Sequence, residues 1–148
     1  MGVSAVELFD GCYASRREVR APASLVGSGG GTTVPVAVWA FADGLVVTAV
    51  DGILARHGPR AWKHALDADG VTAEALIDDH PEAVVLRRDT VASIQLRSGA
   101  WRKWARLAAA CATFECTDRS EFDLLVDRWR AVELASLLDR IYGSRFRA

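Results

Sequence analysis

The fold is decided by residues 33–50, which read TVPVAVWAFADGLVVTAV. β-branched and aromatic residues dominate both halves of this stretch, as is typical of strands. The dipeptide Asp43-Gly44 separates the halves and favours a type I′ turn, because both central positions of that turn need positive φ. Residues 33–42 and 45–50 are therefore predicted to form an antiparallel hairpin.

Strand signals continue on both sides of this hairpin. The alternation over 19–26 is interrupted by Pro22, which indicates an edge or the start of a strand. Ala92, Ile94 and Leu96 give the later segment one apolar face. The pattern over 100–112 fits a strand or a helix, and a strand is preferred because a polar turn follows at 117–120. The predicted additional strands are 19–26, 83–86, 90–96, 105–116 and 121–127.

Three helices are predicted. Pro59 precedes a short helix over 60–66, since proline suits the first helical position. Thr72 can cap a second short helix, Ala73 to Asp79, which stops before Pro81. The C-terminal helix is amphipathic, with a glycine just past its end as a C-cap. Its apolar positions are Leu134, Leu137, Leu138 and Ile141, followed by Gly143.

The order of elements predicts an α+β fold. We expect a strongly bent antiparallel sheet or partly open β-barrel of about seven strands, capped by the C-terminal helix. The two short helices form an insertion over 53–82, within a body over 18–142. Residues 1–17 are expected to dock as an N-terminal arm or short helix. With 148 residues, 51% of them hydrophobic, 1–148 is expected to be a single domain.

Composition excludes several functional classes. Eighteen Lys and Arg oppose nineteen Asp and Glu, which argues against a globally basic nucleic-acid binder. The sequence has no run of about 18 apolar residues, as a membrane span would need. Its start carries Glu7 and Asp10 rather than a basic signal region. A cytoplasmic location is expected, and three cysteines do not make a disulfide framework. The Ala- and Arg-rich usage suggests a high-GC bacterial genome.

The search for catalytic or cofactor motifs gives weak candidates. The glycine run 27–31 lacks the lysine of a phosphate-binding loop and is followed by β-rich sequence. A small enzyme that uses His64, His80 and the Asp78-Asp79 pair is one alternative, since histidine beside carboxylates can act as a base or hold a metal. The alternative is that these residues are ordinary exposed polar side chains at the end of a helix. No catalytic residue, cofactor or metal is predicted.

A basic aromatic segment over 97–106 is the candidate binding surface. It combines four cations with two indoles, and its residues are Arg97, Trp101, Arg102, Lys103, Trp104 and Arg106. Such a loop suits a protein partner or an anionic membrane, because tryptophan favours the interface and cations favour anionic lipid. Single-stranded nucleic acid is a weaker alternative. The plain alternative is that the indoles pack in the core while the cations reach water.

Two segments resemble bacterial pleckstrin-homology-like (PH-like) domains. One is Arg88–Leu96, and the other runs from Phe122 to Asp127 and on through Ala131 and Leu134 to Leu138. The resemblance implies a curved sheet with a C-terminal capping helix, from which the insertion over 53–82 departs. Eukaryotic members grip phosphoinositides with a basic first loop. Residues 27–32 hold no Lys or Arg, so that ligand is not carried over.

The function that follows is a non-catalytic binding or assembly module. Its exposed strand edges and the 97–106 segment are expected to contact a protein partner or a second copy, giving a homo-oligomer. The alternatives are peripheral membrane binding through 97–106 and the small enzyme described above.

Overall fold

The computed structural model describes residues 5, 7–15, 33–49, 72–98, 109–127 and 130–147. In this part of the chain, eight strands form one sheet in the order β4-β3-β2-β1-β7-β6-β5-β8. Neighbouring strands are antiparallel, except that β5 and β8 are parallel. The strands are β1 (Glu7–Ser15), β2 (Thr33–Phe41), β3 (Gly44–Ala49), β4 (Val84–Arg87), β5 (Val91–Ser98), β6 (Ala109–Cys116), β7 (Glu121–Asp127) and β8 (Phe146–Arg147). The helical elements are α3 (Ala73–Asp79), α4 (Ala131–Tyr142) and the 3-10 turn η4 (Gly143–Arg145).

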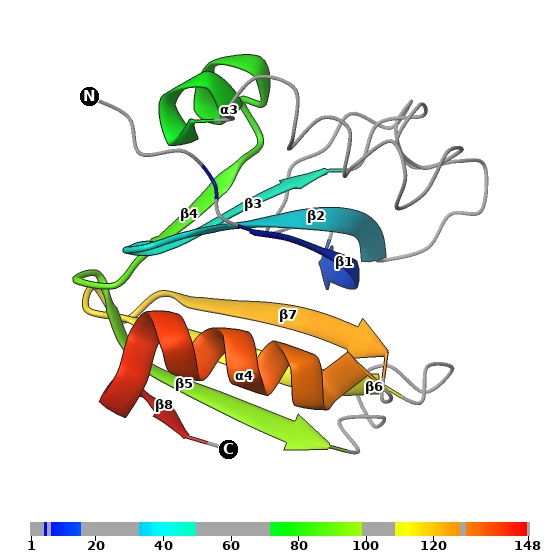
Figure 1. The fold of residues 1–148 in the computed structure, drawn as a ribbon, viewed down its shortest axis with the longest axis vertical. Coiled ribbons are helices and arrows are strands. Elements are labelled where there is room, and N and C mark those ends of the chain that lie inside the picture. Colours follow the sequence, from blue (N-terminus) through cyan, green and yellow to red (C-terminus); the bar gives the residue numbers. More distant parts are fainter. Residues whose placement is uncertain are drawn as a thin grey trace.

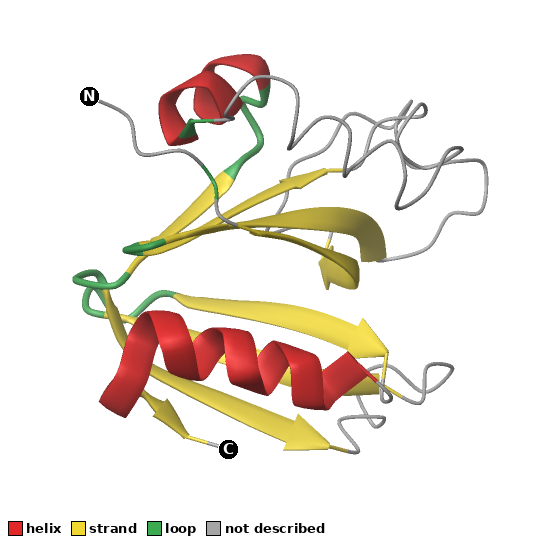
Figure 2. Cartoon of the chain, viewed as in Figure 1, coloured by secondary structure: helices red, strands yellow, loops and turns green. Residues whose placement is uncertain are grey.

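The sheet curls into a half-barrel (Figure 1). Strands β1 to β4 form one half, strands β5 to β8 form the other, and β1 pairs with β7 where the halves join. Helix α4 lies along the open side, and the short helix α3 lies outside the first half, beyond β3 and β4 (Figure 2). This architecture is consistent with the PH-like α+β fold that the sequence resemblance implied.

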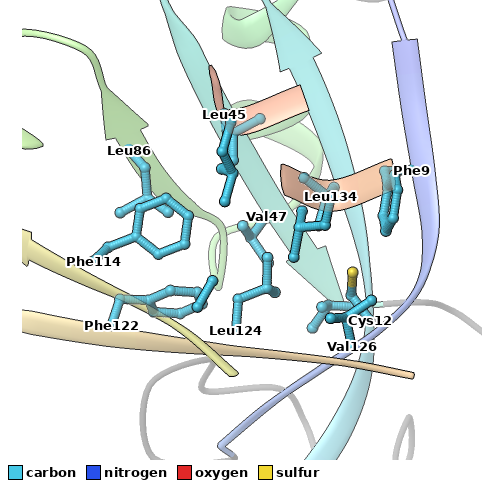
Figure 3. Close-up of a cluster of buried hydrophobic side chains, with 14 of the residues drawn as sticks. Phe9, Cys12, Leu45, Val47, Leu86, Phe114, Phe122, Leu124, Val126 and Leu134 are labelled. Atoms are coloured by element: carbon cyan, nitrogen blue, oxygen red, sulfur yellow. The ribbon is translucent and has the colours of Figure 1, made fainter. Parts of the chain in front are cut away.

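The core fills the space between the two halves and α4 (Figure 3). Phe114 on β6 is completely buried and meets Phe122 and Tyr142 edge-on, with ring centroids 6.2 and 5.9 Å apart. The Tyr142 hydroxyl donates a hydrogen bond of 2.5 Å to the Leu86 carbonyl, so α4 is fastened to β4. Burial raises the pKa of Tyr142 above its ordinary value.

The β2–β3 hairpin is confirmed, but the predicted type I′ turn is wrong. Phe41 pairs with Gly44, so the two turn residues are Ala42 and Asp43. Neither has positive φ; within the described residues only Arg119 and Gly143 do. Gly44 is needed for another reason, because a Cβ there would lie 2.5 Å from the carbonyl oxygen of Leu86 on the neighbouring strand.

The prediction for the N-terminus is also corrected. Residues 7–15 form β1, a strand in the middle of the sheet between β2 and β7, rather than an arm or a short helix. The sequence shows no regular alternation of apolar and polar residues here, because β1 carries an irregularity between Phe9 and Cys12 that shifts which side chains point inward. The predicted strand 19–26 lies outside the described residues.

Both helices whose residues are described agree with the sequence. Helix α3 spans Ala73–Asp79, and the Thr72 hydroxyl accepts the Ala75 N–H at 3.2 Å. The predicted helix over 60–66 lies outside the described residues, so the pair of inserted helices is not confirmed. Helix α4 ends at Tyr142, and the C-cap residue Gly143 has a φ of 57°, a positive value that glycine adopts without strain.

The strands of the second half differ from the prediction in two details. A bulge between Val91 and Ser93 makes both Val91 and Ile94 point into the core, while Ala92 is exposed. The simple alternation predicted for this strand is therefore wrong at its start. The strand predicted over 105–116 is seen as β6 from Ala109, and residues 100–108 lie outside the described part.

Candidate functional site

The candidate site begins with the outer edge of β4. In the described part of the chain, β4 pairs with β3 alone. The Arg88 N–H donates to the Asp43 carbonyl at 2.7 Å, and hydrogen-bonded pairs alternate along an antiparallel ladder. Leu86 therefore bonds toward Leu45, and the N–H and C=O of Val85 point to the open edge.

A cleft of about 570 Å³ runs along this edge, between β4 and the turn that joins β6 to β7. The turn is well defined, since Arg119 has a φ of 68° and the Asp118 carboxylate accepts the Ser120 backbone N–H at 2.9 Å. Hydrogen bonds from the Ser120 hydroxyl and N–H lower the pKa of Asp118. The far side of the cleft is thus polar and fixed in shape.

The outer face of the first half carries a second apolar cluster. Trp39, Phe41 and Val46 point away from the main core and pack beneath Leu76 of α3. The Trp39 indole N–H donates to the Thr48 hydroxyl at 3.0 Å, which satisfies the polar atom of a buried tryptophan. Helix α3 is therefore held on this face by burial of apolar side chains.

The apolar cluster is incomplete beside β4, where a groove of about 220 Å³ lies between α3 and the strand. Ile77 and Val85 line it and are 41% and 38% exposed. They are two of the three exposed large hydrophobic side chains among the described residues; the third is Val132 on α4. Among the described residues, the backbone of Val85 has no partner on the edge side of β4, and its side chain is exposed in the groove.

The predicted basic aromatic surface is described only at its first residue. Arg97, near the end of β5, is exposed and donates a hydrogen bond of 2.5 Å to the Gln95 side chain. Trp101, Arg102, Lys103, Trp104 and Arg106 lie outside the described residues, so this surface stays a prediction. Among the described helices, none is long and apolar enough to cross a bilayer.

The residues named for the enzyme alternative do not gather around His80. Its ring nitrogen Nδ1 lies 3.0 Å from the Glu82 carboxylate, whereas Asp78 and Asp79 are exposed on α3. His64 lies outside the described residues. Within the described part, no three His, Cys, Asp or Glu side chains come together as a metal site would require.

The three cysteines differ in burial and form no cross-links with one another. Cys12 and Cys111 are buried and Cys116 is half-buried, and these three, all of them described, form no disulfide. Burial, with a smaller effect from Asp127, raises the pKa of the Cys12 thiol. Cys12 is therefore a core side chain rather than a nucleophile.

Sequence reasoning found β4 but missed the site. The run Ala83–Leu86 was predicted as a strand, yet its position at the end of the sheet depends on pairing between distant segments. One local signal was available, because strands of this length often lie at sheet edges. Ile77 gave no signal, since an apolar residue in an amphipathic helix is normally assumed to be covered.

Comparison with known proteins finds similarity among solved structures. No family model and no curated protein matches the chain. Among solved structures, it is similar to one described as the structure of the Spt16D Pob3N heterodimer, with 12% sequence identity and a TM-score of 0.49. The match covers 97% of this chain and 53% of the other, so the chain spans about half the length of that structure.

Proposed function

We propose that this protein is a non-catalytic binding module that takes an extended segment of a protein partner as an added strand on β4. The observation that carries the proposal is the open edge at Val85. An unpaired strand edge is a template for another strand, and main-chain hydrogen bonds then supply affinity. The cleft beside β4 gives the incoming segment room.

The groove under α3 supports recognition of side chains. Alternate residues of an added strand point to the same face of the sheet as Val85. A medium-sized apolar side chain on that face would cover Ile77 and Val85, the exposed apolar residues that line this groove. The expected partner segment is therefore extended and β-branched, with an apolar residue at the position beside the groove.

The test is selection of a random displayed peptide library on the full chain. Selected peptides are then measured against Val85→Pro, which removes the edge N–H at a position where a strand tolerates proline. We expect this variant to bind the peptides about tenfold or more weakly, which corresponds to a loss of about 1.4 kcal/mol or more in binding free energy. Ile77→Ser should weaken binding less, because it alters the groove alone.

The matched control is Val132→Ser, which changes an exposed apolar residue on α4, away from the edge. Binding to this variant should be unchanged. The proposal is wrong if no peptide is enriched, or if the selected peptides bind Val85→Pro as tightly as the parent chain. Reversible dimerisation in sedimentation that Val85→Pro abolishes would identify the added strand as that of a second copy.

A further inference from the structure

A second feature lies where β4 ends. A cavity of about 440 Å³ is lined, among the described residues, by charged side chains from three parts of the fold. Arg87 ends β4, Arg88 and Asp89 belong to the turn that follows, Asp43 is in the β2–β3 turn, and Arg145 is in η4. Residues that are far apart in the sequence thus meet at one corner of the half-barrel.

Backbone contacts bring the segments that carry these residues together. The hydrogen bond from the Arg88 N–H to the Asp43 carbonyl joins the two turns. Gly143, which has a positive φ, begins the turn that carries Arg145, and a Cβ at Gly143 would lie 4.0 Å from the Arg88 guanidinium. The turn η4, which carries Arg145, therefore lies beside the Arg88 side chain.

The three arginines differ from others on the surface. Arg130 pairs with Glu133 at 3.0 Å, and Arg140 pairs with Glu7 at 2.8 Å. Within the described residues, Arg87, Arg88 and Arg145 form no ion pair, although two aspartates line the same cavity. Their N–H donors are thus available to a ligand.

The chemistry of the lining selects a class of ligand. Each guanidinium offers five N–H donors in a planar fork that suits phosphate oxygens. Three guanidiniums together offer more donors than the oxygens of one carboxylate can accept. Three cations outnumber two anions, which favours an anionic group. Asp43 and Asp89 only accept hydrogen bonds when ionised, so they suit hydroxyl or amino donors beside that group.

We propose that Arg87, Arg88 and Arg145 form a binding site for a phosphate monoester that carries a hydroxyl or amino group next to the phosphate. This activity goes beyond strand addition and uses the corner rather than the edge of β4. The phosphate source is either a free metabolite or the headgroup of a phospholipid, because both present the same chemistry to the three guanidiniums.

The experiment titrates the full chain with inorganic phosphate and with glycerol 3-phosphate at constant ionic strength, using NMR signals of the arginine side chains. We expect saturable shifts at Arg88 and Arg145, with tighter binding of glycerol 3-phosphate than of phosphate. Vesicles of phosphatidylcholine with and without lysophosphatidic acid, which keeps a free glycerol hydroxyl beside its phosphate monoester, form the second arm. Binding to free ester alone identifies a metabolite, and flotation with lysophosphatidic acid identifies a lipid headgroup.

Four variants make the test decisive. Arg88→Gln and Arg145→Gln should each weaken binding about tenfold or more, whereas Arg140→Gln, an exposed arginine on α4, should not. Asp89→Asn should tighten the binding of inorganic phosphate, because the substitution removes a negative charge that repels phosphate and leaves every arginine in place. The proposal is overturned if chloride at the same ionic strength gives the same shifts, if neither arm binds, or if Arg140→Gln weakens binding as much as Arg88→Gln.

Discussion

The two halves of the sheet share one core but have different outer faces. In the β1–β4 half, the outer face is apolar around Trp39 and Val46 and is covered by α3. In the β5–β8 half, the outer face carries polar side chains along much of its length, with buried Cys111 and Leu125 toward one end. The polar members are Ser93, Gln95, Arg97, Thr113, Glu115 and Asp123.

This difference shows where a further layer can bind. A polar outer face gains little from being covered, because its groups already bond to water and to one another, as Thr113 does to Asp123 at 2.8 Å. The apolar outer face gains from each additional contact. It is left uncovered beside β4, where Ile77 and Val85 are exposed, and this is the side on which we place the partner segment.

The largest effect is expected in the shared core. Phe114→Ala should lower the free energy of unfolding by about 3–5 kcal/mol, since it leaves a cavity between Phe122 and Tyr142. Urea denaturation measures this loss of unfolding free energy. Its exposed neighbour provides the control, because Glu115→Ala should stay within about 0.5 kcal/mol. A small loss in Phe114→Ala would mean that the two halves do not share one core.

The next effect compares the two outer faces. Leu76→Ala should cost about 2–3 kcal/mol, because it opens the apolar layer under α3. Gln95→Ala on the polar outer face should cost less than about 0.5 kcal/mol. The same denaturation experiment serves both variants. Equal costs would contradict the contrast between the faces.

Gly44→Ala tests how closely β4 packs on β3. The added Cβ would meet the Leu86 carbonyl at 2.5 Å, so the strands must separate. A cost of about 1–3 kcal/mol is expected from overpacking. Amide exchange in β4 should accelerate more than exchange in β6. Unchanged exchange in β4 would count against the close approach of the two strands.

Tyr142→Phe tests the hydrogen bond that links α4 to β4. Loss of the hydrogen bond to Leu86 should cost about 1 kcal/mol at pH 7. Burial raises the pKa of Tyr142, so an unfolded chain, with an ordinary tyrosine pKa of 10.0, releases this proton first. Stability of the parent chain should therefore fall as pH rises above 10.0.

The pH dependence also has an internal control. The raised pKa of Cys12 acts in the same direction in both proteins, so their difference isolates Tyr142. The difference between parent and Tyr142→Phe should shrink above pH 10.0, since phenylalanine does not ionise. A difference that stays constant across this range would show that the hydroxyl is not buried.

The smallest effect on stability belongs to the edge itself. Val85→Lys should change the free energy of unfolding by less than about 0.5 kcal/mol, because the side chain is already partly in water. The charge should nevertheless abolish binding of peptides selected on the parent chain, since lysine at an edge opposes strand addition. Strong destabilisation would show that Val85 belongs to the core.

The sequence predicted most of the described elements because their signals are local. The alternation in β2 and β3, the Thr72 cap and the heptad-like spacing of Leu134 to Ile141 depend only on near neighbours. β1 was missed since its irregularity breaks the alternation. The edge of β4 and the arginine corner depend on pairing between segments that are far apart in the sequence, such as Val46 with Val85, which no local pattern specifies. Arg88 and Arg145, for example, meet only because β4 and α4 end at the same corner.

The most direct measurement is amide hydrogen exchange of the free, full chain, resolved at single residues of β4. The Leu86 N–H bonds toward β3 and should exchange slowly, whereas the neighbouring Val85 N–H points to the open edge and should exchange fast. Fast exchange at Val85 beside slow exchange at Leu86 is the result expected for an edge that accepts a strand. Equal protection of both amides would show that the edge is already covered and would contradict the proposed function.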